Sequence, residues 1–164
     1  MRSKRFFTTL TVAVLVTLAA AAALALAACG GSDSSASSAD VEFISAGDFD
    51  VADYAGKPLV VNYFGSWCGP CNVEAPEVAA FAESHPEAAL VGIAVEDDQQ
   101  AVQEFMGKYG LSYPVVLDDG SLQAADAITG VPTTIFYDSA GKEVDRIVGS
   151  ATTGQLDLSY AKAM

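Results

Sequence analysis

The feature that most constrains the fold is a pair of cysteines placed two residues apart where a strand pattern changes into a helix pattern. Residues 67–71 read WCGPC, and they follow the apolar, β-branched run LVVNYF at residues 59–64. Such a short run of Val, Leu and aromatic residues is typical of a central strand. The next residues, 72–84, are predicted to form a helix, and Gly69 and Pro70 suit the turn into it. A strand, a tight turn and a helix in this order indicate an α/β domain.

The rest of the chain repeats this alternation. Residues 90–95 (LVGIAV) form a second buried strand pattern, and Val102, Phe105, Met106 and Tyr109 share one helical stripe that Gly110 can terminate. Further strands are expected at 115–117, 133–137 and 144–148, a hairpin turn at 138–142, and helices at 121–127 and from about 152. The pattern predicts one domain over residues 41–164.

The N-terminus carries an export pattern. Arg2, Lys4 and Arg5 precede an almost wholly apolar, Ala-rich stretch at residues 10–28, which predicts a signal peptide over residues 1–28. Cys29 follows directly, in LAAC at residues 26–29, which resembles the lipobox of bacterial lipoproteins. That resemblance implies cleavage before Cys29 and lipidation of its thiol. An uncleaved membrane anchor and an ordinary cleavage site are the alternatives.

Residues 30–40 (GGSDSSASSAD) contain no large apolar side chain, so residues 29–40 are expected to form a lipidated cysteine followed by a flexible tether. Removing residues 1–28 would take away three of the 8 basic residues and none of the 21 acidic ones, which leaves five against 21 and a net charge of −16. A field of this sign disfavours nucleic acid and anionic lipid as partners and favours solubility.

The cysteine pair suits thiol chemistry. The thiolate is the attacking species, and a helix N-terminus lowers the pKa of a cysteine placed there, as is expected for Cys68. Cys71, one turn later, can resolve a mixed disulfide. The alternative is half of a zinc site, but the only other cysteine or histidine residues are Cys29 and His85, so no metal is expected. His85 is predicted to be a surface loop residue.

Residues 56–149 resemble the thioredoxin superfamily, and within it the TlpA/ResA-like extracytoplasmic thiol-disulfide oxidoreductases. The motif at 67–71 is similar to the active-site motif of that family, and GVPTT at 130–134 to its cis-proline loop. Pro76 matches a kink in the active-site helix. Residues 97–119 resemble the helix and strand inserted in this branch. The resemblance implies a three-layer α/β/α sandwich with a mixed central sheet.

It also implies roles for single residues. Val131 and Pro132 would be joined by a cis bond that presents the Val131 backbone as a strand-like dock for substrate, and Trp67 would cover the cysteines and share in the dock; a core-only Trp67 is the alternative. Asn62 stands where plain thioredoxins carry a buried aspartate, and an amide cannot transfer protons in its place. Glu74 matches an active-site glutamate of the ResA-like branch; a solvated glutamate near the helix start is the alternative.

The expected function is disulfide exchange on exported proteins, with Cys68 attacking, Cys71 resolving and no cofactor required. The resemblance further implies a membrane thiol-disulfide electron donor, attachment to the bacterial membrane through Cys29, and cytochrome c maturation as the pathway. Three alternatives remain: an oxidant that forms disulfides in secreted proteins, a peroxiredoxin, and a non-catalytic metal-binding module.

Overall fold

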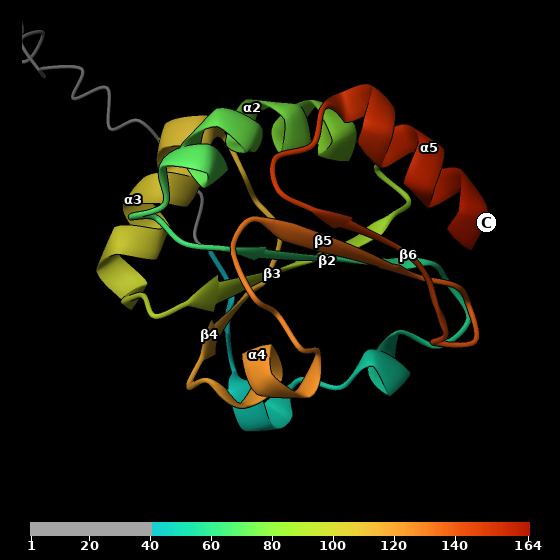
Figure 1. Cartoon of the computed structure of the whole chain (residues 1–164), viewed down its shortest axis with the longest axis horizontal. Helices are drawn as coiled ribbons and strands as arrows, with labels where there is room; N and C mark the ends of the chain where they lie inside the picture. The colour runs from blue at the N-terminus through green and yellow to red at the C-terminus, as the bar shows by residue number, and fades with distance from the viewer. Residues whose placement is uncertain (1–40) are drawn as a thin grey trace, which may run out of the picture. The chain divides into compact units, whose positions relative to one another are not determined.

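A mixed sheet of six strands forms the middle of the domain (Figure 1). The computed structural model describes residues 41–164; the signal peptide, the lipidation of Cys29 and the tether, all three predicted from the sequence, lie outside the described residues. The strands are β1 (Phe43–Ser45), β2 (Leu59–Phe64), β3 (Ala89–Val95), β4 (Val115–Asp118), β5 (Thr133–Tyr137) and β6 (Glu143–Val148). The helices are α2 (Gly69–Ser84), α3 (Gln99–Tyr109), α4 (Ser121–Ala125) and α5 (Thr153–Ala163), with short 3-10 turns at Ala46–Asp48 and Val51–Tyr54.

The order of the sheet is β1-β4-β3-β2-β5-β6. The first four strands in this order are parallel, β5 runs antiparallel to them, and β6 runs antiparallel to β5 and so in the direction of the first four. All six residues of β2 are buried, which explains its continuous apolar sequence, because a central parallel strand is covered on both faces. The carboxyl end of β2 leads directly into the cysteine motif at the centre of the sheet edge.

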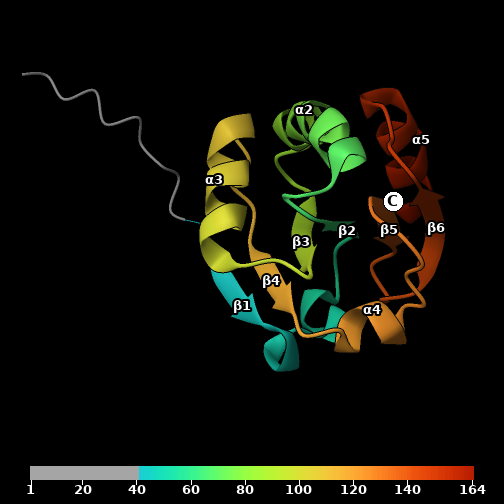
Figure 2. The same cartoon turned by 60° about the vertical axis from the view of Figure 1, so that its left-hand side comes forward.

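Helices cover both faces of this sheet (Figures 1 and 2). Helices α2, α3 and α5 lie on one face, where Phe64 of β2 stacks on Phe105 of α3 with ring centroids 5.1 Å apart. Helix α4 and the 3-10 turns lie on the other face, over a second apolar cluster that contains Tyr63 and Ile93. The three-layer α/β/α sandwich with a mixed sheet is therefore confirmed.

Most predicted elements are present, with shifted ends. The active-site helix begins at Gly69 and not at residue 72, with Cys68 as its N-cap, and the helix predicted at 121–127 ends at Ala125. The expected turn at 138–142 joins β5 to β6. Strand β1 and the two 3-10 turns were not predicted. Within residues 41–164, no helix is long and apolar enough to cross a membrane.

Candidate redox site

Cys68 and Cys71 form a disulfide at the start of α2. Both are buried, with 4% and 2% of their surface exposed. The backbone N–H of Cys71 donates to Sγ of Cys68 over 3.2 Å, so the first sulfur occupies the N-cap position of the helix. Unpaired N–H groups and the positive end of the helix dipole at this position stabilise a thiolate, which favours Cys68 as the attacking sulfur.

The loop before β5 lies against this disulfide. The bond between Val131 and Pro132 is cis, as the resemblance implied, and the carbonyl oxygen of Val131 lies 3.5 Å from Sγ of Cys68. Gly149, which follows β6, donates its N–H to the Pro132 carbonyl over 2.9 Å. Val131 itself is half-buried next to the disulfide.

Trp67 lies on the surface beside the disulfide. It is 58% exposed, and its indole N–H donates to the Val95 carbonyl at the end of β3 over 3.1 Å. The ring packs over Gly65, where an added Cβ would lie 2.7 Å from indole atoms, so this position requires a residue without a side chain. The alternative of a core-only tryptophan is wrong.

Glu74 is buried below the cysteines. Only 2% of it is exposed, so the alternative of a solvated glutamate near the helix start is also wrong. One carboxylate oxygen accepts from the Ala151 N–H over 2.9 Å, and the other accepts from the Asn62 side-chain amide over 3.1 Å. Burial raises the pKa of this carboxyl above 4.5, although both hydrogen bonds act in the opposite direction.

Asn62 connects Glu74 to the strand that follows the cis-proline loop. Its amide also donates to the Thr134 hydroxyl over 2.9 Å. Asn62, at the position where plain thioredoxins carry an aspartate, therefore does not titrate. Its amide instead binds the carboxylate of Glu74, which does titrate. The titratable carboxyl beside Asn62 therefore belongs to α2 and not to β2.

Three residues near the disulfide were not singled out in the sequence. The Asp97 carboxylate accepts from the N–H and the hydroxyl of Ser66, over 2.6 and 2.9 Å. Asn72 donates to the carbonyls of Ser66 and Cys68 over 3.0 and 2.9 Å. The only sequence signal was position, because Ser66 and Asn72 flank the WCGPC motif and Asp97 begins the segment resembling the family insertion.

His85 is not a simple surface residue. It is the C-cap of α2, half-buried between the rings of Phe81 and Tyr160, and its two nitrogens lie 3.3 Å from a Glu87 oxygen and 3.0 Å from an Asp157 oxygen. It therefore links α2 to α5. In the part of the chain that the structure describes, no group of three or more His, Cys, Asp or Glu residues could hold a metal ion.

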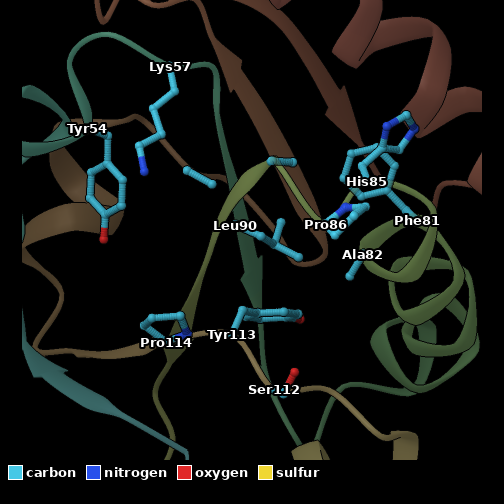
Figure 3. Close-up of a pocket in the computed structure, with 12 residues that line it drawn as sticks. Tyr54, Lys57, Phe81, Ala82, His85, Pro86, Leu90, Ser112, Tyr113 and Pro114 are labelled. Atoms are coloured by element: carbon cyan, nitrogen blue, oxygen red, sulfur yellow. The ribbon is translucent and has the colours of Figure 1, made fainter.

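The cavity in Figure 3, of about 480 Å³, lies at the other end of the parallel strands. Lys57 precedes β2, Leu90 lies at the start of β3, and Tyr113 precedes β4; all three line it. Since the disulfide follows the carboxyl end of β2, this cavity is not part of the redox site.

Comparisons with known proteins agree with this geometry. The sequence profile of the family described as Redoxin matches residues 45–164. The chain belongs to the redoxin family. Among redoxin relatives, it is 32% identical over 111 residues to "Thiol-disulfide oxidoreductase ResA" of Bacillus thuringiensis (strain Al Hakam), a match that covers 66% of this chain and 64% of the relative. The chain thus spans slightly less than two thirds of the length of that protein.

Two further similarities concern secreted proteins. The chain is 34% identical over 117 residues to "Soluble secreted antigen MPT53" of Mycobacterium bovis, covering 71% of this chain and 68% of the relative. A solved structure of a secreted Mycobacterium tuberculosis disulfide oxidoreductase, described as homologous to E. coli DsbE, superposes with a TM-score of 0.62 at 32% identity, over 69% of this chain and 87% of that one. The resemblance to the ResA-like branch of the thioredoxin fold is thereby confirmed.

Proposed function

We propose that this protein is an extracytoplasmic thiol-disulfide oxidoreductase that reduces disulfides of exported proteins. The observation that carries the proposal is the Cys68–Cys71 disulfide at a helix N-terminus, 3.5 Å from the backbone carbonyl of Val131 in the cis-proline loop. A polarised sulfur beside a main-chain carbonyl suits exchange with a peptide disulfide that pairs with this loop.

In the reduced protein, the Cys68 thiolate attacks one sulfur of the substrate disulfide. The substrate S–S bond breaks, the other substrate sulfur leaves as a thiolate, and a mixed disulfide forms. Cys71 then loses its proton and attacks Sγ of Cys68, which releases the second substrate thiolate and closes the Cys68–Cys71 disulfide. Two electrons pass to the substrate in each cycle.

Glu74 is proposed as the group that takes the Cys71 proton. Glu74 is buried and lies one turn further along α2 than Cys71. Because its pKa is raised, its carboxylate is a better proton acceptor near neutral pH than that of an ordinary glutamate. Glu74→Gln is expected to slow closure of the disulfide about a hundredfold and to change its pH dependence. A pH–rate profile that overlays the parent's would remove Glu74 from the mechanism.

Trp67 and the Val131–Pro132 backbone are proposed to bind the substrate segment. The Val131 backbone would offer hydrogen bonds to an extended chain, and the exposed indole of Trp67, which precedes Cys68 in the motif, would offer apolar surface. Exported proteins that contain disulfides are the matching partners.

A membrane location is proposed from the N-terminal sequence. Lipid on Cys29 would anchor the protein outside the cytoplasm, where a membrane thiol-disulfide donor would return electrons to the Cys68–Cys71 pair, with cytochrome c maturation as the pathway. The names of its relatives support the extracytoplasmic part, since one is a soluble secreted antigen. Mass spectrometry of the membrane fraction should find a mature protein that begins at lipidated Cys29; a different N-terminus would contradict the anchor.

Trapping tests the assignment of the two cysteines. Cys71→Ser leaves the attacking thiol without its resolving partner, so mixed disulfides with exported proteins should accumulate in cells and dissolve on addition of dithiothreitol. Cys68→Ser, the matched control, should trap nothing. The opposite pattern would reverse the roles, and no adducts with either variant would refute the function.

The reduction potential decides the direction of exchange. A reductase is expected near the thioredoxin value of about −270 mV, whereas an oxidant of secreted proteins would lie near the DsbA value of about −120 mV. Equilibration with glutathione buffers measures it directly.

A further inference from the structure

Asn72, the residue directly after Cys71, has both ends of its side chain engaged. Its amide nitrogen donates to the carbonyls of Ser66 and Cys68 over 3.0 and 2.9 Å. On the other end, its oxygen accepts from groups of α3, the Tyr109 hydroxyl over 2.8 Å and the Lys108 ammonium over 3.2 Å. Two donors and two acceptor sites are the full capacity of an asparagine side chain.

The partners fix the orientation of this amide. Backbone carbonyls can only accept and a lysine ammonium can only donate, so a flipped amide would mismatch these three partners, and only the Tyr109 hydroxyl could adapt by accepting. Aspartate would lack the donors for the carbonyls of Ser66 and Cys68, and an aliphatic residue would lack both functions. Among residues of this size, asparagine is the one that joins two carbonyls to two donors.

The carbonyls that Asn72 holds belong to the loop that carries the attacking sulfur. This loop, residues 65–68, has two other side-chain anchors, Asp97 on the Ser66 N–H and hydroxyl and the Trp67 indole on the Val95 carbonyl. Both of those reach the end of β3 and the turn after it. Asn72 supplies the only side-chain connection from the described part of α3 to the main chain of the redox loop.

We propose that Asn72 is a positioning residue that couples helix α3 to the redox loop and so holds Cys68 at the N-cap of α2. The proposal concerns the same disulfide exchange and rests on Cys68 and Cys71 being its redox pair. With Asn72 in place, the backbone around Cys68 stays in the conformation that aims the Cys71 N–H at the Cys68 sulfur. Without it, the loop gains freedom, and the thiolate loses part of the stabilisation that the helix start provides.

Asn72→Ala tests this with readouts that do not depend on a substrate. The pKa of the Cys68 thiol, followed by thiolate absorbance in the reduced protein, is expected to rise by up to about one unit, a tenfold loss of thiolate stabilisation. The same loss moves the equilibrium with glutathione toward the disulfide by up to about tenfold, which lowers the potential by up to about 30 mV. Exchange with a peptide disulfide at neutral pH should slow about tenfold or more, since misplacement of a reacting group by an ångström can cost a hundredfold.

Tyr109→Phe tests the coupling to α3 without touching the loop. It removes one hydroxyl and keeps the ring, which packs on Phe105 with centroids 5.0 Å apart, so the fold should be unaffected. We expect a smaller shift of the Cys68 pKa in the same direction. In the double variant, Tyr109→Phe should add nothing to Asn72→Ala, because its effect passes through the missing amide.

Gln100→Ala is the matched control, an exposed amide of α3 that bonds only Glu104 in the described chain, and it should leave all three readouts at the parent values. If Asn72→Ala keeps the parental thiol pKa and potential, Asn72 is only structural and the proposal is wrong. If the two substitutions are additive, the coupling does not run through Asn72. A parent protein that fails to exchange disulfides would refute the proposed function, whereas the thiol titration would still test Asn72.

Discussion

At the scale of single residues, the buried carboxyl of Glu74 makes the stability of the fold depend on pH. Its pKa in the folded protein is raised above 4.5, chiefly by burial, so as the pH rises the unfolded chain loses this proton first. The contribution of Glu74 to the free energy of unfolding therefore falls between about pH 4.5 and the raised pKa. The slope of that fall is up to about 1.4 kcal/mol per pH unit.

Glu74→Gln should remove this fall, because a neutral amide of the same size does not titrate. The pH-dependent contribution of Glu74 is measured by urea unfolding between pH 4 and 8, as the difference in unfolding free energy between parent and variant. Glu77→Gln is an informative control: hydrogen bonds from Thr153 lower the pKa of the half-buried Glu77, so its stabilising effect is present at higher pH and is lost on acidification. A constant difference between parent and Glu74→Gln would contradict the burial argument.

The residues of the site differ in how well their roles could be predicted from the sequence. Cys68 and Cys71 lie in one short motif, so their spacing was sufficient to predict a redox pair. The cis bond before Pro132 was predicted only from the resemblance of residues 130–134 to the family's loop. The burial of Glu74 depends on the Ala151 N–H, which lies 77 residues away in the chain. Asn72 likewise acquires its role only when α3 packs beside α2, and no local pattern reports that contact.

At the scale of elements, close packing between β2, β3 and the loop before β4 leaves no free space for a side chain at Gly92. An added Cβ would lie 2.9 Å from the ring of Phe64 and 3.0 Å from that of Tyr113. Gly92→Ala should therefore destabilise the domain by about 1–3 kcal/mol, as overpacking does in a rigid core. Thermal or urea unfolding measures the loss.

Gly107→Ala provides the contrast. Gly107 is an exposed residue within α3, and a Cβ there meets nothing within 4 Å. Alanine should stabilise the domain by about 0.5–1 kcal/mol, since glycine is the poorer helix former. Equal effects of the two substitutions would mean that Gly92 is not tightly packed.

Helices and strands were predicted correctly where one element carried a long hydrophobic pattern of its own. Strands β2 and β3 have continuous apolar runs and were placed to within one residue, and the clear helical stripe of α3 gave its end at Gly110. The three residues of β1 gain their strand conformation only by pairing with β4, beginning with Phe43 opposite Val115. A segment of that length has no pattern of its own, so the sequence alone did not reveal it.

At the scale of the whole molecule, the acidic charge should select among substrates. The full chain carries a net charge of −13, and one without residues 1–28 would carry −16. A disulfide peptide flanked by lysines should react about tenfold faster at 10 mM than at 500 mM salt, because its encounter with the protein is steered electrostatically. The same peptide with glutamates in their place should show the reverse dependence in stopped-flow measurements. If both peptides show the same salt dependence, the net charge of the protein does not affect the rate at which substrates encounter the redox site.

Trp67 is the single tryptophan of the chain, more than half exposed and adjacent in sequence to the sulfur that changes its bonding. Its position gives the protein an optical signal of its own. The emission of this indole is expected to change when the adjacent Cys68–Cys71 disulfide is reduced, with no other indole contributing background. The proposed opening and closing of the Cys68–Cys71 disulfide can thus be followed in unlabelled protein through the emission of Trp67.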